Sequence, residues 1–104
     1  MTFGLPEKSR NMIIKELKQR KEIKEAAIFG SRAMGNYKNG SDVDLVIYGP
    51  EVTEHVISQL RITLNEELPL PYYFDIVHYE TISSDPLKEH IDSVSRSLYQ
   101  PNPL

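Results

Sequence analysis

The sequence contains no cysteine, so disulfide bonds, thiolate metal ligands and a cysteine nucleophile are all excluded. It also lacks any apolar run near the ~20 residues of a membrane-spanning helix, and its first residues lack the charged-then-apolar order of a secretory signal. Positive charge is scarce, because 12 Lys and Arg against 15 Asp and Glu give a net charge of −3. We therefore expect a cytoplasmic protein that binds neither membranes nor duplex nucleic acid.

What remains is the composition of a small folded domain. The 104 residues are 39% hydrophobic and 26% charged, which is typical of a globular chain, and this length predicts a single domain over residues 1–104. A chain of this size buries only about 65% of its unfolded surface. We therefore expect little interior space for enclosing a substrate, and a gain in stability from docking on a partner.

Hydrophobic spacing predicts three helices and three strands. Apolar residues recur at helical spacing in residues 6–21, 52–64 and 85–98. The apolar face of the last helix is predicted to consist of Leu87, Ile91, Val94 and Leu98, and Pro101 and Pro103 are expected to end it. Strands are predicted at residues 26–29 from a short apolar run, at residues 42–48 from alternation, and at residues 72–79 from aromatic and β-branched residues. The order predicts an α/β or α+β fold with a small central sheet flanked by helices.

Residues 29–48, FGSRAMGNYKNGSDVDLVIY, contain most of the polar candidates for a functional site. Gly35 and Gly40 have the spacing of a P-loop, but Ser41-Asp42 follows where that loop requires Lys and a hydroxyl residue. The triplet beginning at Asp42 starts like a calcium loop, but Val46 occupies the next ligand position and no Gly follows it. Both motifs are excluded. Tyr37, in the same segment, is expected to be a solvated loop residue.

Two aspartates define the strongest candidate site. Asp42 and Asp44 lie two residues apart on a predicted strand, so their side chains point to the same face, about 7 Å apart at the backbone. Hard oxygen ligands in this arrangement suit Mg²⁺, and two such ions about 3.5–4 Å apart can hold a triphosphate and a nucleophile for an in-line displacement.

Asp75 and Gly30-Ser31 extend this candidate site. Asp75 is the only acidic residue in the apolar run YYFDIVHY, where an unpaired charge would cost several kcal/mol, so we expect a cation or donor beside it. Gly30-Ser31 follows a predicted strand, where backbone amides and the Ser31 hydroxyl can hold a phosphate. Taken singly, the glycine-serine pair could be an ordinary turn and the paired aspartates could be capping residues. The combination with Asp75 favours a metal and phosphate site.

The spacing resembles the signature of the polymerase-β-like nucleotidyltransferases: Gly30-Ser31, ten residues, then Asp42-Val43-Asp44, with Asp75 in FDIV at the position of the third carboxylate. More narrowly, the chain is similar over nearly its whole length to minimal nucleotidyltransferase (MNT) subunits, which carry GSRAxG and SDxDL. The resemblance implies the nucleotidyltransferase fold, with a small mixed central β-sheet.

The resemblance also implies a role for each site residue. Asp42 and Asp44 would hold two Mg²⁺ ions, and Asp75 would hold one of them and help to deprotonate the incoming hydroxyl. Gly30 and Ser31 would bind the triphosphate. Arg32 would either reach the pyrophosphate or form a structural ion pair, since its planar guanidinium suits both.

The implied activity is magnesium-dependent transfer of a nucleoside monophosphate, AMP from ATP, to a hydroxyl, with release of pyrophosphate. Larger family members carry further domains that bind the acceptor, so for this chain we expect the acceptor to come from elsewhere. MNT subunits are usually paired with a small all-helical HEPN protein, and some act as antitoxins that adenylylate a tyrosine on it. We expect such a partner, in a homo- or hetero-oligomer. Two alternatives remain: neutralisation of the partner by binding alone, and transfer to a small molecule such as an aminoglycoside.

Overall fold

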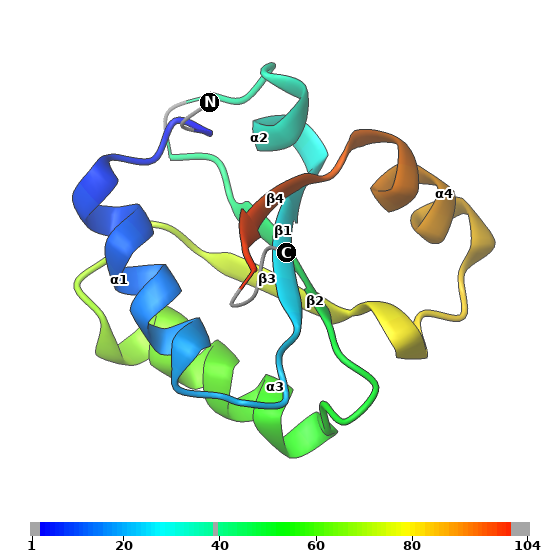
Figure 1. The fold of residues 1–104 in the computed structure, drawn as a ribbon. Helices are drawn as coiled ribbons and strands as arrows, with labels where there is room; N and C mark the ends of the chain where they lie inside the picture. Colours follow the sequence, from blue (N-terminus) through cyan, green and yellow to red (C-terminus); the bar gives the residue numbers. More distant parts are fainter. Residues whose placement is uncertain (1–2, 39, 101–104) are drawn as a thin grey trace.

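A four-stranded mixed sheet with the order β3-β2-β1-β4 forms the centre of the molecule (Figure 1). In this computed structural model, which describes residues 3–38 and 40–100, the strands are β1 (Glu25–Phe29), β2 (Val43–Tyr48), β3 (Phe74–His78) and β4 (Arg96–Tyr99). β1 pairs antiparallel with both β2 and β4, whereas β2 and β3 are parallel. The expected small mixed sheet is therefore confirmed.

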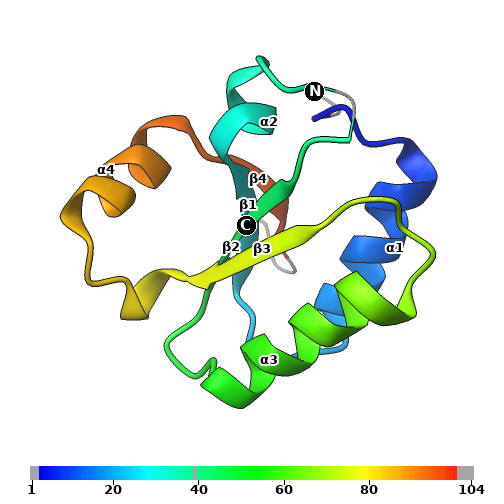
Figure 2. The same cartoon turned by 180° about the vertical axis from the view of Figure 1, so that it is seen from behind.

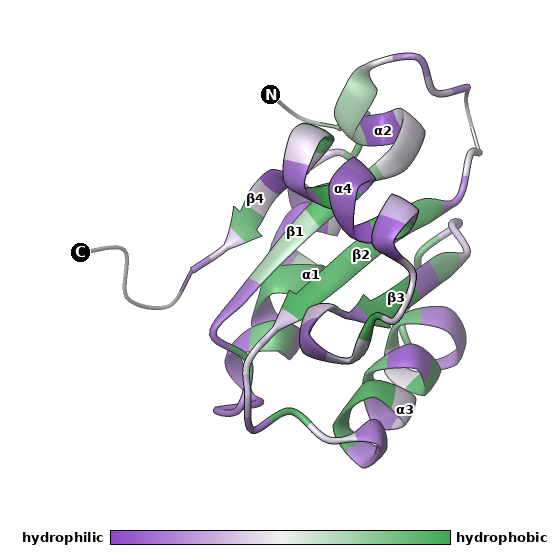
Figure 3. Cartoon of the chain, turned by 90° about the vertical axis from the view of Figure 1, so that its right-hand side faces the viewer, coloured by the Kyte–Doolittle hydropathy of each residue, from purple (hydrophilic) through white to green (hydrophobic). Residues whose placement is uncertain are grey.

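Helices lie on both faces of this sheet. α1 (Glu7–Lys18) and α3 (Glu54–Ile62), which continues into the π-helical turn η1 (Thr63–Glu67), are on one side, and α4 (Asp85–Val94) is on the other (Figures 2 and 3). The short helix α2 (Gly30–Met34) follows β1 directly, and the 3-10 turn η2 (Tyr79–Thr81) follows β3. Among the described residues, no helix is long and apolar enough to cross a membrane.

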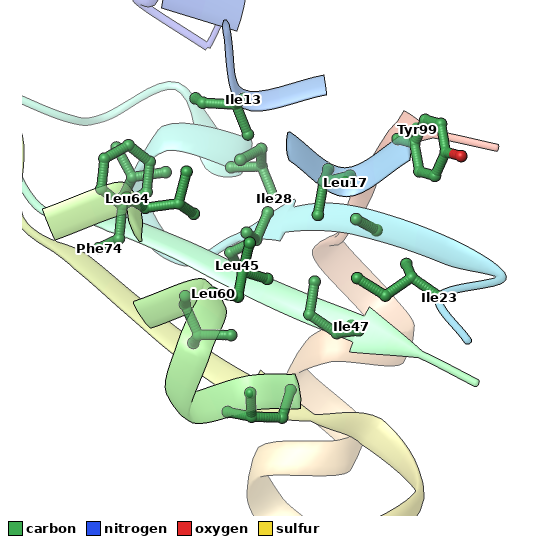
Figure 4. Packing of buried hydrophobic residues seen from close by; sticks show 14 of the residues in the cluster. Ile13, Leu17, Ile23, Ile28, Leu45, Ile47, Leu60, Leu64, Phe74 and Tyr99 are labelled. Atoms are coloured by element: carbon green, nitrogen blue, oxygen red, sulfur yellow. The ribbon is translucent and has the colours of Figure 1, made fainter. Parts of the chain in front are cut away.

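Alternation along the strands divides the buried side chains into two clusters. The larger cluster joins α1 and α3 to one sheet face, and Figure 4 shows its centre around Ile28, Leu45 and Phe74. The smaller cluster joins α4 to the other face and consists of Ala27, Phe29, Val46 and Ile91 with partly buried neighbours. Successive strand residues point to opposite faces of the sheet. The residues of β2 that lie two positions before and two positions after Val46 therefore face α4, as Val46 does.

Side-chain caps mark the starts of two helices. The hydroxyl of Thr53 accepts a hydrogen bond from the amide of Val56 at 3.2 Å at the start of α3. The hydroxyl of Ser84 accepts one from the amide of Leu87 at 3.3 Å at the start of α4, with Pro86 in the first turn. Both caps satisfy amides that have no partner within the helix.

The segment after Val94 corrects the prediction of a helix reaching Leu98. α4 ends at Val94, Ser95 is extended with φ −64° and ψ 148°, and Arg96–Tyr99 form β4. The spacing of Val94 and Leu98 is compatible with a helix, but β1 offers an open edge whose backbone groups pair with this segment. That pairing also buries the side chain of Tyr99. Pro101 and Pro103 lie outside the described residues.

Candidate functional site

Three carboxylates lie where β2 and β3 begin. Asp44 and Asp75 are direct partners across the parallel ladder, and Asp42 immediately precedes β2. Asp44 is half-buried, whereas Asp42 and Asp75 are exposed. Asp44 lies two residues before Val46 on β2, so the two side chains point to the same face of the sheet. Val46 packs under α4, and the paired acids therefore lie on the α4 side of the sheet.

Gly30 lies against the carboxylate of Asp44. β1 is antiparallel to β2, and Phe29, its last residue, is the partner of Asp44. Gly30 follows with φ +71°, and a Cβ atom at this position would overlap Oδ2 of Asp44. The left-handed backbone and the close approach both require glycine here. The half-buried Ser31 comes next, in the first turn of α2, so the structure brings the glycine-serine pair and the paired acids to one end of the sheet.

The local electrostatics disfavour an ionised Asp44. Burial raises the pKa of Asp44 above its ordinary value, and the negative charges of Asp75 and Asp42 raise it further. His90 of α4 acts in the opposite direction. This is the response expected of a carboxylate that is partly buried beside like charges.

His90 is a neighbour of the site that no sequence motif singles out. Its ring meets the ring of Phe29 edge-on, with centroids 6.0 Å apart and an interplanar angle of 77°. Phe29 is in turn the ladder partner of Asp44. The helix predicted over residues 85–98 contains His90, but local spacing does not place that helix over this end of the sheet, so no local signal could have identified His90.

The donor chemistry of the site suits a hard divalent cation. All three acidic side chains provide oxygen atoms, and their combined negative charge is what Mg²⁺ neutralises. Within residues 3–38 and 40–100, however, no three His, Asp or Glu side chains are gathered closely enough to form a metal cluster. The oxygen donors and the negative charge of the three acids therefore suit Mg²⁺, and which of them bind it is a matter of proposal.

Arg32 is directed into the protein. Its residue is 2% exposed, and its Nε and Nη2 atoms donate to the carbonyl oxygen of Ser41 at 3.2 and 2.8 Å. Its Nη1 atom donates to the carbonyl oxygen of Phe3 at 2.9 Å. The guanidinium carbon also lies 5.1 Å from the ring centroid of Tyr37 and 5.0 Å from that of Tyr72. In the described part of the chain, no carboxylate forms an ion pair with Arg32.

The aromatic residues around the site differ in their surroundings. Tyr37, expected to be a solvated loop residue, is half-buried, and the guanidinium carbon of Arg32 lies over its ring. Phe74 is fully buried in the larger cluster, and Tyr72 packs against that cluster. Tyr73 is 57% exposed. These contacts depend on distant segments and could not be read from local periodicity.

A mixed sheet with paired acids at the start of two parallel strands, beside a glycine-serine turn, defines a domain of the nucleotidyltransferase type. The chain belongs to the polymerase beta, nucleotidyltransferase family, whose model matches residues 11–104. No curated protein sequence gives a significant match.

Solved structures of toxin–antitoxin proteins have the same fold. A toxin–antitoxin with AMP-PNP aligns with a TM-score of 0.73 and 21% identity, over 89% of this chain and 74% of that chain. The toxin–antitoxin MntA-HepT gives a TM-score of 0.69 and 18% identity, over 91% and 73%. A complex of tri-AMPylated Shewanella oneidensis HEPN toxin with MNT antitoxin gives 0.67 and 19%, over 88% and 70%. At these identities the likeness concerns the fold.

Proposed function

We propose that this protein is a magnesium-dependent adenylyltransferase of the MNT antitoxin type, which transfers AMP from ATP to a hydroxyl group of a HEPN partner. The observation that carries the proposal is the direct pairing of Asp44 with Asp75 across adjacent strands, with Asp42 immediately before β2. Membership of the nucleotidyltransferase family agrees with this chemistry. The donor nucleotide, the metal and the acceptor are parts of the proposal.

The three acids are proposed to hold the metal ions, and one of them also accepts a proton. Asp42 and Asp44 would hold two Mg²⁺ ions, and Asp75 would share one of them. When bound, the metal would neutralise phosphate charge and lower the pKa of the attacking hydroxyl. The hydroxyl oxygen attacks the α-phosphorus, its proton passes to Asp75, and the bond to the β-phosphate oxygen breaks to release pyrophosphate. The charges that raise the pKa of Asp44 favour binding of a cation.

Gly30 and Ser31 are proposed to bind the triphosphate. The absence of a side chain at Gly30 lets the backbone lie directly against Asp44, so phosphates held by the metal ions would also meet the start of α2. The Ser31 hydroxyl would donate to a phosphate oxygen. Arg32 shares this segment, but its guanidinium donates to backbone carbonyls, so we do not assign it a phosphate contact.

The acceptor is proposed to belong to a partner protein. Asp42 and Asp75 are exposed, so a hydroxyl on another chain could approach them. Structural relatives include a complex in which a HEPN toxin is AMPylated, and this chain would act on a comparable helical partner. The proposal includes a cytoplasmic location, where ATP is available.

The test is label transfer with the protein encoded beside this chain. The two proteins are co-purified and incubated with Mg²⁺ and ATP labelled at the α- or the γ-phosphate. We expect label on the partner from α-labelled ATP only, and none with Asp44→Asn. Glu51→Gln is the matched control, because Glu51 is an exposed acid beyond the opposite end of β2.

Other outcomes would replace the proposal. Neutralisation of the partner by Asp44→Asn, with no transfer by wild type, would identify an antitoxin that acts by binding alone. Efficient labelling of an aminoglycoside, with none on the partner, would identify a small-molecule transferase. Label from another nucleotide in preference to ATP would change the donor but retain the reaction class.

A further inference from the structure

We propose that Arg32 is a positioning residue, which holds Asp42 in place for the metal by fixing the peptide unit that precedes it. The inference rests on the proposed function of the carboxylates. Arg32 and its four contacts, Phe3, Tyr37, Ser41 and Tyr72, are called the Arg32 cluster below.

The two hydrogen bonds to Ser41 are the main support. Nε and Nη2 of Arg32 both donate to the carbonyl oxygen of Ser41, and this carbonyl belongs to the peptide bond that joins Ser41 to Asp42. On the other side of Asp42, the amide of Val43 donates to the carbonyl oxygen of Tyr73 at 2.8 Å. Asp42 is therefore an exposed residue between two anchored peptide units, and Arg32 provides one of the anchors.

The same guanidinium connects the other segments that lead to the site. Arg32 follows Ser31 directly, and its guanidinium carbon lies over the ring of Tyr72, which lies shortly before Asp75 in the chain. The second aromatic contact of Arg32 is Tyr37. A cation buried without a carboxylate is retained only where several groups replace its lost hydration. Here two carbonyl oxygens and two aromatic rings do so.

The N-terminal segment completes this cluster. The carbonyl oxygen of Phe3 accepts from Nη1 of Arg32 at 2.9 Å. Gly4 has φ +72°, and a Cβ atom there would overlap the ring of Tyr37. The segment before α1 thus lies against the Arg32 cluster, although it is remote from the carboxylates in the sequence.

The contacts of Arg32 require a guanidinium, and the ammonium group of a lysine could not make all of them. A guanidinium has a planar fork whose Nε and Nη2 atoms can both donate to one carbonyl oxygen, and it can also stack on aromatic rings. An ammonium has the same charge but lacks the fork and the flat faces. Arg32→Lys therefore separates the charge of Arg32 from its ability to hold Ser41.

The experiment compares Arg32→Lys and Arg32→Gln with Arg10→Lys as the matched control. Arg10 also donates to a backbone carbonyl of the N-terminal segment, that of Leu5 at 3.3 Å, but it is not in the Arg32 cluster. For each full-length variant we would measure thermal unfolding, amide hydrogen exchange at Ser41 and Val43, and binding of Mn²⁺. Activity with the partner would give the Mg²⁺ requirement and the KM for ATP.

A positioning role predicts that both Arg32 variants remain folded, exchange the two amides at least about tenfold faster, and bind Mn²⁺ about tenfold more weakly. The Mg²⁺ concentration for half-maximal activity rises and kcat falls, while the KM for ATP at saturating Mg²⁺ is unchanged. Arg10→Lys changes none of these. A raised KM for ATP with wild-type exchange and Mn²⁺ affinity would overturn the inference, because it would indicate a direct phosphate contact.

If the Arg32 variants do not fold, another variant tests the positioning role of Arg32. Tyr37→Leu removes one aromatic contact and leaves the hydrogen bonds of Arg32 in place, so a smaller increase in exchange at Ser41 and a smaller loss of Mn²⁺ affinity are expected. Wild-type behaviour in both measurements would overturn the inference. The exchange and Mn²⁺ measurements need no transferase activity, so the failure of the proposed function would remain distinguishable.

Discussion

Asp75→Asn in metal-free protein tests whether the paired carboxylates are held together against their mutual repulsion. Asp75 is the ladder partner of Asp44, and its charge is one of the causes that raise the pKa of Asp44. Neighbouring strands are about 4.8 Å apart, and two like charges about 4 Å apart in water repel by about 1 kcal/mol. Because Asp75 is exposed, the aqueous value applies, and salt screens it further. We expect the free energy of unfolding to increase by about 0.5–1 kcal/mol at pH 7 and low salt.

The pH dependence of this gain follows from the direction of the shift. The pKa of Asp44 is raised in the folded protein, so ionisation of Asp44 disfavours folding. That loss is absent below the unfolded-state pKa, grows as pH rises towards the folded-state pKa, and is constant above it. The advantage of Asp75→Asn should therefore shrink as pH falls through this interval.

The assay is urea unfolding of wild type and Asp75→Asn in EDTA across this pH range, with Glu51→Gln as the control. Excess Mg²⁺ should remove or reverse the advantage, since a ligand that binds only the native state stabilises it and the variant lacks one of the proposed ligands. Lower stability of Asp75→Asn in EDTA, together with retained transferase activity, would refute the reasoning and make Asp75 a structural residue.

Three further predictions concern the same end of the sheet. Asp44→Asn should abolish nucleotidyl transfer. Its thermal midpoint in EDTA should equal or exceed that of wild type, because the change removes charge with little change in shape. Normal transfer would exclude Asp44 as a metal ligand. His90→Gln should raise the pKa of Asp44 further, because His90 lowers it in the wild-type protein. The pKa would be measured by NMR titration of the carboxyl carbon of Asp44. An unchanged pKa would show that His90 does not act on Asp44. Gly30→Ala should lower the free energy of unfolding by at least about 1–2 kcal/mol, which is the cost of a left-handed backbone for a residue with a side chain. The variant should also have reduced transfer activity. Wild-type stability in urea would contradict the geometry at Gly30.

Local patterns in the sequence predicted most of the secondary structure. The strand at residues 42–48 was expected from alternation, and β2 covers Val43–Tyr48. The helix expected at residues 52–64 corresponds to α3 and the turn that follows it. The elements missed are the short helix α2, the 3-10 turn η2 and β4. The strand conformation of β4 depends on pairing with β1. A propensity summed over neighbouring residues contains no information on that edge.

The candidate site shows the same division. The sequence by itself determined the spacing of Gly30-Ser31 from Asp42 and Asp44, because covalent distance and strand alternation are local properties. Only the tertiary structure decided that Asp75 is the partner of Asp44, because the register between β2 and β3 joins segments separated by a helix.

Burial was likewise decided by the tertiary structure. Arg32 had two sequence-based interpretations, a phosphate contact and an ion pair, and both assumed that its guanidinium meets an anion. Its observed partners are carbonyl oxygens of Phe3 and Ser41 and two aromatic rings. Residue type and spacing determine which groups a segment can offer. Whether a charged group meets solvent, an anion or the interior depends on the segments that fold over it, because desolvation and hydrogen bonding are properties of the whole packed structure.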